Sequence, residues 1–404
     1  MKTNFVKLRW LFTMLLFVTT MIMPTMMLAK SIDLKIPEGD GAGTPYKIGT
    51  AEELYWFAGL VNGTLPGVKK DLSANAILTD DIIVNTGVLD PNKDLVSGND
   101  FIEWIPIGKS SSDDDAYTGT FDGNGHTISG LYFNKSNSWY VGLFGCIGAK
   151  GKISNVGVSD SYFQSSNCPY IGGVCGSNSG ELQNCSNSST VIGKENEYRI
   201  GGVCGYNSGT VKDCKNTGSV RGKETIGGVC GNNSGTIKSC YNTASVSGQN
   251  SVGGVSGYNY GGTIKSCYNT ASVSGQYSVG GVCGDNYEGP ITNCYYLSGT
   301  VADGKGGIGG KDDENGKAVE MSKDRFKSGE VAWLLNGSKS VSTEESTLAW
   351  YQKLGENADA YPVLTSTGDN TVYGGYQHGS RVRFFSNTVQ HSTGECKLNC
   401  VKLQ

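Results

Sequence analysis

Hydrophobic and polar positions along residues 225–277 follow one pattern that occurs twice in succession. In each copy a β-branched residue precedes a Gly-Gly pair, and short runs of Val, Ile, Thr and Tyr alternate with Gly and Asn-Ser turn signals. Copies begin at offsets of 29, 26, 26 and 27 residues, at Ile171, Ile200, Ile226, Val252 and Val279, with a degenerate copy at Val141. A fixed period of this length predicts stacked units that bury their apolar sides against their neighbours.

The repeated unit has the composition of short strands. The copies at 225–277 contain no Leu and no apolar spacing of three and four residues, which disfavours leucine-rich and helical repeats. One unit accommodates roughly three short strands and three turns, and successive units stack at the ~4.8 Å spacing of paired strands. The sequence therefore predicts an all-β fold, a parallel and right-handed β-helix or solenoid.

Stacking places each residue over its counterpart in the next coil, so recurring positions predict ladders. Ala244 and Val246 alternate with serines, which predicts apolar side chains inside and serines in water. Gly227 and Gly228 suit a corner that needs positive φ or close backbone approach. One Asn set is predicted at a turn, in or near the left-handed region and bonded to the local backbone: Asn178, Asn207, Asn233, Asn259 and Asn286. A second set is predicted to form a side-chain amide ladder: Asn187, Asn216, Asn242 and Asn269.

Most of the 13 cysteines fall into two further ladders. The ladders lie 10 or 11 residues apart and consist of Cys175, Cys204, Cys230 and Cys283, then Cys185, Cys214, Cys240, Cys267 and Cys294. No CxxC motif is present, and Ser256 replaces Cys in one copy, which favours buried free thiols that fill small spaces in the core. Disulfides between neighbouring coils and metal binding are the alternatives.

The phrase GGVCGNNSGTIKSCYNTASVSG at residues 227–248 resembles the GLUG motif. This motif is a repeat of bacterial exported proteins, found in adhesin-like surface proteins and in the non-catalytic part of immunoglobulin-A-specific metallopeptidases. The resemblance covers residues 141–299 and several copies match in series. It implies a β-helical stalk or binding surface at the cell exterior, and it implies no reaction.

The first 29 residues combine Lys2, Lys7 and Arg9 with an apolar run that ends at Ala29. This pattern predicts a secretory signal peptide at 1–29, with an uncleaved membrane anchor as the alternative. Removal of these three positive charges changes the formal net charge from -4 to -7. A mildly acidic chain with scattered Lys disfavours nucleic acid and anionic membranes as partners, and no membrane insertion is expected after signal removal.

Residues 30–140 are predicted to form an N-terminal cap and the first coils. A capping box at Thr50–Glu53, followed by apolar residues at helical spacing up to Asn62, predicts a short helix over the open end of the stack. Strands are predicted within 75–84 and 104–108, and two more around a Gly-Asn-Gly turn within 117–133. This run resembles the first coils of pectin-lyase-like β-helices.

Three segments follow the repeat solenoid at 141–303. Residues 304–347 are predicted to contain a Gly-rich linker and a capping helix at 322–336 for the opposite end. Residues 348–376 resemble the piece that follows GLUG arrays and predict a short β element. The tail at 377–404, which contains Cys396 and Cys400, matches no element pattern.

The sequence lacks the residue patterns of two kinds of catalytic site. A peptidase of the metallopeptidase type needs HExxH, and none of the three His residues, His126, His378 and His391, begins that motif. Glycoside hydrolysis needs two nearby carboxylates, but the two central copies carry no acid, so stacking forms no pair there. We therefore expect a protein that is not an enzyme and that has no cofactor or metal, with a polysaccharide lyase or hydrolase on a β-helix as the alternative.

Rows of tyrosine are the candidate binding residues. Tyr241, Tyr268 and Tyr295 recur at one position, and Tyr206 and Tyr258 at another. Such rows can dock sugar rings or a partner protein, although stacked tyrosines can also simply stabilise the ladder. The sequence favours a secreted or cell-surface bacterial protein, a monomeric β-helical adhesin or spacer that presents a face to glycan or to host or matrix protein.

Overall fold

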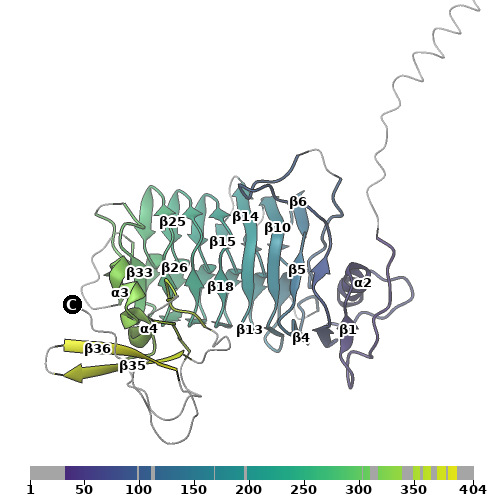
Figure 1. The fold of residues 1–404 in the computed structure, drawn as a ribbon. Coiled ribbons are helices and arrows are strands. Elements are labelled where there is room, and N and C mark those ends of the chain that lie inside the picture. Colours follow the sequence, from purple (N-terminus) through teal and green to yellow (C-terminus); the bar gives the residue numbers. More distant parts are fainter. Residues whose placement is uncertain are drawn as a thin grey trace, which may run out of the picture. The chain divides into compact units, whose positions relative to one another are not determined.

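The computed structural model describes residues 32–97, 100–110, 114–167, 169–194, 198–302, 304–309, 317–338, 349–354, 358–364, 371–378 and 381–388, the last two as backbone. Its coils pack into the parallel β-solenoid that the repeat predicts, with successive strands side by side (Figure 1). Handedness remains a prediction. The predicted signal peptide at 1–29, together with Cys396 and Cys400, lies outside the described residues.

Sheet 1 contains nine parallel strands, which follow one another in chain order along the stack. Its strands are β1 (Tyr46–Ile48), β2 (Ala76–Leu78), β4 (Thr120–Asp122), β9 (Lys152–Ser154), β13 (Glu181–Gln183), β17 (Thr210–Lys212), β22 (Thr236–Lys238), β27 (Thr263–Lys265) and β32 (Ile291–Thr292). The strand β32 therefore forms one edge of this sheet.

Sheet 2 contains 13 strands because most coils contribute either one long strand or two short ones. Its strands are β3 (Ile82–Ile83), β5 (Thr127–Ser129), β6 (Tyr132–Ser136), β10 (Gly157–Ser166), β14 (Ser186–Lys194), β18 (Lys215–Asn216), β19 (Val220–Arg221), β23 (Tyr241–Asn242), β24 (Val246–Ser247), β28 (Tyr268–Asn269), β29 (Val273–Ser274), β33 (Cys294–Leu297) and β34 (Ala318–Met321).

Sheets 3 and 4 contain six strands each and follow one another within every repeat. Sheet 3 consists of β7 (Tyr140–Val141), β11 (Tyr170–Gly172), β15 (Tyr198–Gly201), β20 (Glu224–Gly227), β25 (Asn250–Gly253) and β30 (Tyr277–Gly280). Sheet 4 consists of β8 (Phe144–Ile147), β12 (Cys175–Asn178), β16 (Cys204–Asn207), β21 (Cys230–Asn233), β26 (Ser256–Tyr260) and β31 (Cys283–Tyr287).

The register of the sheets equals the repeat period. Ile226 pairs with Val252, and Cys230 pairs with Ser256, as the sequence alignment of the copies predicts. The interior consists of β-branched and Leu ladders whose members are at most 3% exposed: Ile171, Ile200, Ile226, Val252, Val279; Val174, Val203, Val229, Val255, Val282; Leu182, Val211, Ile237, Ile264, Ile291; Val191, Val220, Val246, Val273. Burial of each such side chain contributes about 1.5–3 kcal/mol, so the ladders form the core of the stack.

Backbone conformation corrects two details of the sequence interpretation. The Asn178 set and the pair Gly227 and Gly228 do not have positive φ. Positive φ occurs instead at two other corners, at Asn155, Asn184, Asp213, Ser239, Ser266 and Asn293, and at Arg199, Thr225, Ser251 and Ser278. Gly228 is required by close approach, because a Cβ atom there would lie 2.2 Å from the carbonyl oxygen of Gly254.

One region before the repeats differs from the predicted strands, and another matches them. Residues 104–108 form no strand and contribute one isolated bridge, from Ile107 to Phe144. The two strands predicted around the Gly-Asn-Gly turn are β4 and β5, of which β4 pairs in sheet 1 with β9 and β5 pairs in sheet 2 with β10. The Gly-Asn-Gly turn is thus a corner between two sheets of one coil.

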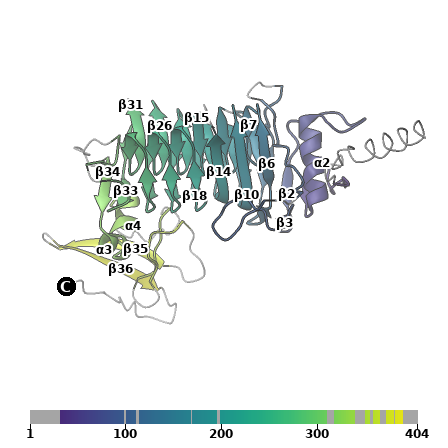
Figure 2. The same cartoon turned by 90° about the horizontal axis from the view of Figure 1, so that it is seen from above.

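The predicted N-terminal helix is α2 (Ala51–Asn62). The hydroxyl of Thr50 accepts a hydrogen bond from the Glu53 N–H, and Gly63 ends the helix in the left-handed conformation at φ 65. Phe57 is fully buried, with its ring 6.0 Å from that of Phe121 in the first coils. Figure 2 shows α2 beside the first strands. The contact of Phe57 with Phe121 shows that the helix covers apolar side chains of the first coils.

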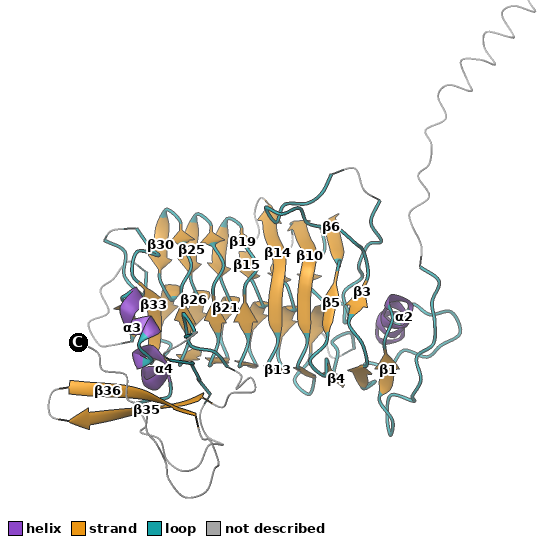
Figure 3. Cartoon of the chain, in the orientation of Figure 1, coloured by secondary structure: helices purple, strands orange, loops and turns teal. Residues whose placement is uncertain are grey.

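The predicted helix at 322–336 is two short helices, α3 (Lys323–Lys327) and α4 (Glu330–Leu335). Gly329 separates them, because its left-handed φ of 85 interrupts the helical hydrogen bonding. Both helices lie near β33 and β34, away from α2 (Figure 3). None of the helices among the described residues is long and apolar enough to cross a bilayer.

These two helices cover a flank of the last coils instead of the open end of the stack. The ring of Phe326 in α3 makes an edge contact with Tyr268, whose side chain belongs to the outer face of sheet 2. The buried cluster that joins helices and sheet consists of Tyr268, Tyr295, Met321, Phe326, Val331, Leu335 and Trp350. The C-terminal segment therefore packs along the solenoid.

A β element does follow, as the sequence predicts for 348–376, but it extends further along the chain. The antiparallel strands β35 (Thr371–His378) and β36 (Arg381–Thr388) pair over their full length. The strand β36 lies within residues 377–404, where the sequence pattern indicates no element.

Candidate functional site

Both Asn sets form buried amide ladders along the stack. In the first set each Nδ2 up to Asn259 donates to Oδ1 of the next coil, at 2.8 Å from Asn233 to Asn259 and at 2.7 Å from Asn259 to Asn286. The same Nδ2 also donates to a carbonyl two or three residues ahead, such as Gly235 at 3.3 Å. The prediction that these Asn residues bond the local backbone is confirmed. They lie at strand ends inside the solenoid and not at the predicted turn.

The second set forms the amide ladder that the sequence predicts. Asn187, Asn216, Asn242 and Asn269 are fully buried, and the Nδ2 of each of the first three donates to the next Oδ1 at 2.8 Å. Tyr296 takes the position after Asn269, whose Nδ2 donates to the Ala271 carbonyl at 2.8 Å. The ladders pair the interior amides of successive coils, which stabilises the stack.

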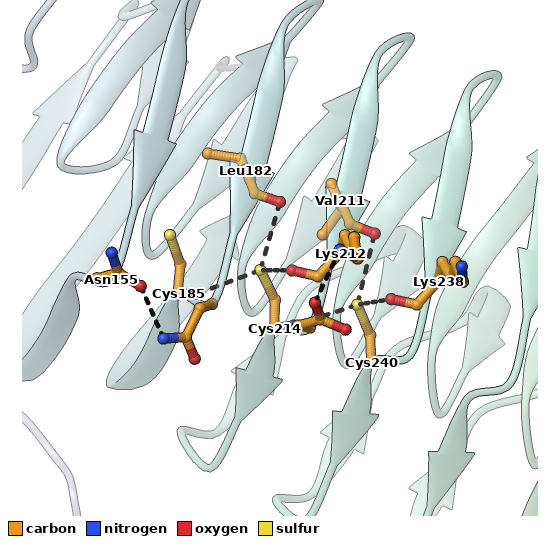
Figure 4. A network of polar contacts seen from close by, with 10 residues as sticks. Asn155, Leu182, Cys185, Val211, Lys212, Cys214, Lys238 and Cys240 are labelled. Atoms are coloured by element: carbon orange, nitrogen blue, oxygen red, sulfur yellow. Dashed lines mark hydrogen bonds and ion pairs between the residues drawn. The ribbon is translucent and has the colours of Figure 1, made fainter. Parts of the chain in front are cut away.

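The cysteine ladders consist of free thiols in the described part of the chain. Ten cysteines there are buried and unpaired. In both ladders the thiols lie within hydrogen-bond reach of carbonyl oxygens. Cys214 Sγ lies 3.2 Å from the Lys212 oxygen and 3.8 Å from the Leu182 oxygen, so its one hydrogen can donate to either, and Cys240 repeats the pattern one coil further (Figure 4). The interpretation of these thiols as small core residues is confirmed for them. Among the described residues no group of three metal-ligating side chains occurs.

Burial also controls the acidity of these thiols. Desolvation raises the pKa of Cys230, Cys240 and Cys267 well above the ordinary value of a thiol. Their reactive thiolate form is therefore suppressed at neutral pH. At these three positions the buried thiols contribute packing, and nucleophilic chemistry is disfavoured.

The row Tyr241, Tyr268 and Tyr295 is stacked but covered. Rings of Tyr241 and Tyr268 lie 5.0 Å apart and 8° from parallel. Tyr268 is 1% exposed, its ring lies 5.2 Å from that of Trp350, and its hydroxyl donates to the carbonyl of Pro362 at 2.6 Å. The row thus serves as a packing surface for the C-terminal segment, and it is not open to a ligand as the sequence-based hypothesis requires.

Tyr206 lies on the outer face of sheet 4 within a packed cluster. The guanidinium carbon of Arg199 lies 5.9 Å from the Tyr206 ring centroid and 5.1 Å from that of Tyr170. Tyr170 in turn stacks on Tyr140, 5.0 Å away and 4° from parallel. The Tyr206 hydroxyl donates to Ser234 Oγ at 3.5 Å. Cation–π contacts of this kind stabilise the surface, which matches the simpler interpretation of stacked tyrosines.

Tyr258 belongs to a more open cluster at the end of the stack. It lies 6.1 Å from Tyr260, which stacks on Tyr287 at 5.4 Å and 12° from parallel. Tyr260 is 55% exposed and Tyr287 is 51% exposed. Sequence reasoning named Tyr258 but gave no role to Tyr260, although one extra residue after Asn259 marks it in the repeat alignment.

Asp213 has no carboxylate at the equivalent positions of the neighbouring coils, as the alignment predicts. Pairing of Gln183 with Lys212, and of Lys212 with Lys238, places Asp213 between Asn184 and Ser239. The Asp213 carboxylate forms an ion pair with Lys212 at 3.3 Å. No second carboxylate flanks Asp213 along this ladder.

These coils and ladders define a parallel β-solenoid repeat protein. The family model for the GLUG motif matches residues 196–221 and 248–274, so the chain carries this repeat. It is similar to Halomucin of Haloquadratum walsbyi, with 38% identity over 84 residues, which is 21% of this chain and 1% of that protein. It is also similar to a putative Gly-rich membrane protein of Evansella cellulosilytica, with 33% identity over 78 residues, which is 19% of this chain and 9% of that protein.

The matched segment is therefore a small part of these relatives' own length. No solved structure matches the chain significantly. The similarity concerns the repeated unit and supports a surface or structural repeat protein.

Proposed function

We propose that this protein is an exported, non-enzymatic surface protein whose solenoid acts as an adhesin or spacer and presents a face to glycan or to host protein. The observation that carries the proposal is the contrast between interior and surface. Inside, amide and thiol ladders are satisfied coil by coil. Outside, tyrosines of sheet 4 at the last two coils are more than half exposed. A rigid stack with exposed aromatic rings is suited to binding a partner.

Surface location is part of the same proposal. Its support is the basic and apolar segment at residues 1–29 together with similarity to a protein named Halomucin and to one named a Gly-rich membrane protein. Both names describe those relatives, of which the chain matches a short part. We propose a secreted or cell-surface location on this basis.

Expression of the full chain in a bacterial host tests the location of the protein. Whole cells are labelled with a membrane-impermeant amine reagent, and medium and cell fractions are probed for the protein. We expect labelled or secreted protein, and retention of all protein inside unlabelled cells would contradict export.

Activity is tested by incubating the purified full chain with a polysaccharide panel and with host matrix proteins. We expect retention of a ligand without new reducing ends or unsaturated products. Release of such products would replace the proposal by a polysaccharide-active enzyme. Binding to neither class of ligand would leave only a spacer.

A further inference from the structure

An insertion distinguishes the last two coils from the coils before them. In the earlier copies the ladder Asn binds the carbonyl of a Gly two residues further along the chain, as Asn233 binds Gly235. In the last two coils this Gly is three residues further along, at Gly262 for Asn259 and at Gly289 for Asn286. The strands β26 and β31 are correspondingly five residues long, against four in β21. Insertions in a repeat array project from one face, which is commonly the binding face.

The insertion creates an aromatic platform. It lengthens the two strands by Tyr260 and Tyr287, which pair in register and stack at 5.4 Å. Both rings are more than half exposed. Among the described residues, Tyr260 is the one aromatic ring in stacking contact with Tyr287. Within the described ranges no strand of sheet 4 follows β31, which has one isolated bridge, from Cys283 to Ile308, so no described tyrosine covers the far face of Tyr287.

The first amide ladder ends beside this platform with an unused donor. Asn259 Nδ2 makes two hydrogen bonds, to Asn286 Oδ1 at 2.7 Å and to the Gly262 carbonyl at 2.8 Å. Asn286 Nδ2 donates to Gly289 at 3.0 Å and to no other described residue. An amide nitrogen carries two hydrogens, so one hydrogen of Asn286 Nδ2 remains for an acceptor at the position that a next coil would occupy.

Asn286 also lines a cavity of about 580 Å³. Other polar side chains of its lining are Glu288, Thr292, Asn293 and Lys317. The carboxylate of Glu288 is exposed and accepts hydrogen bonds only, whereas the Asn286 amide hydrogen only donates. A ligand that satisfies both must therefore donate and accept at neighbouring positions. Sugar hydroxyl groups do this.

We propose that the last two coils bind a neutral glycan whose sugar ring stacks on the Tyr260 and Tyr287 platform while its hydroxyl groups bind Asn286 and Glu288. This inference rests on the proposed function and names the site and ligand class for it. Asp285, exposed on the same strand, adds a second negative charge. The carboxylates of Asp285 and Glu288 outnumber the one positive charge of the lining, Lys317, so like-charge repulsion disfavours acidic glycans.

Two other occupants fit the end of the stack less well. A peptide strand added to the edge of β32 would meet Pro290, which lacks the N–H that strand pairing uses. A second copy stacked end to end would present α2, whose residues cover the first coils of that copy. Neither makes use of the exposed rings of Tyr260 and Tyr287.

The test measures binding of the full chain to cello-, xylo-, manno- and chito-oligosaccharides, with oligogalacturonate as the acidic comparison, by glycan array followed by calorimetry. Tyr287→Ala removes the exposed end of the platform, and Glu288→Gln keeps the size of the side chain but removes its charge. We expect Tyr287→Ala to weaken neutral glycan binding by about tenfold or more. Tyr277→Ala is the matched control, since Tyr277 is 67% exposed in the same coil but lies on sheet 3.

Each outcome decides the inference. Neutral glycan binding that falls in Tyr287→Ala and Glu288→Gln but not in Tyr277→Ala supports it, provided that thermal unfolding is unchanged. Neutral glycan binding that is unchanged in Tyr287→Ala overturns this site but leaves the proposed function intact. Selective binding of oligogalacturonate, of host protein alone, or of no panel member overturns the inference. Enzymatic product in the activity assay would overturn the proposed function separately.

Discussion

The side-chain amide of Asn233 donates from Nδ2 to Oδ1 of Asn259 at 2.8 Å, with both residues fully buried. Asn207 repeats the same bond toward Asn233, also at 2.8 Å. Asn207, Asn233 and Asn259 thus each have an amide partner above and below them in the stack. An unpaired buried amide costs about 1–3 kcal/mol, so the ladder ties adjacent coils to one register.

Replacement of Asn233 by Ala should destabilise the solenoid by about 2–5 kcal/mol, because Asn207 Nδ2 loses its acceptor and Asn259 Oδ1 loses its donor. Denaturant unfolding followed by circular dichroism measures this loss. The exposed Ser245→Ala in the neighbouring sheet is the control and should change stability by roughly 0.5 kcal/mol or less. Equal stability of the two variants would contradict the ladder's role.

Stability under reducing conditions should fall as the pH rises above about 8.5, the ordinary pKa of a free thiol. Burial raises the folded-state pKa of Cys230 and Cys240, so the unfolded chain loses protons that the folded chain retains. The stabilisation is complete at pH values below the thiol pKa of the unfolded chain, and it declines as the pH rises toward the thiol pKa of the folded chain. Denaturation midpoints between pH 7 and pH 10 measure the effect.

Alkylation gives an independent check on the same thiols. Reagent should modify the ten described cysteines only after unfolding, without prior reduction. Rapid labelling of the native chain at Cys230 or Cys240, read by peptide mass mapping, would be inconsistent with buried thiols. A deficit of reactive thiols after unfolding would indicate disulfides.

Tyr268→Ala should loosen the C-terminal segment without unfolding the stack. It removes the ring that packs on Phe326 and Trp350, and loss of a buried aromatic side chain costs about 3–5 kcal/mol. We expect faster proteolysis within residues 322–364. Tyr268→Phe retains the ring and loses only the bond to Pro362, so it should cost about 1 kcal/mol. Tyr277→Ala is the exposed control, and equal cleavage rates for it and Tyr268→Ala would refute the packing role.

Gly228→Ala should disturb the corner between sheets 3 and 4. Its Cβ would lie 2.2 Å from the Gly254 carbonyl oxygen and 2.4 Å from Cγ of Asn242, so backbone must move. We expect a loss of more than about 3 kcal/mol, seen as a lower thermal midpoint. At Gly43 the nearest atom to an added Cβ is 3.7 Å away, and Gly43→Ala should be tolerated.

Much of the solenoid could be predicted because in a parallel stack the spatial register equals the repeat period. Alignment of Cys230 with Ser256, or of Asn242 with Asn269, in the sequence is also their pairing in space. Local signals likewise sufficed for α2, where Thr50 and Gly63 mark the ends. These features depend on neighbours along the chain or one period away.

The sequence by itself therefore determined the fold class, the ladders and the free thiols of the repeats. Only the tertiary structure decided which tyrosines face solvent. Tyr268 and Tyr287 each follow another tyrosine by one period, Tyr241 and Tyr260, yet one is 1% and the other 51% exposed. The physical reason is that the burial of Tyr268 comes from Trp350 and Phe326, which belong to a segment outside the period. Periodicity describes contacts between coils, and it contains no information about a non-repeating segment that packs across them.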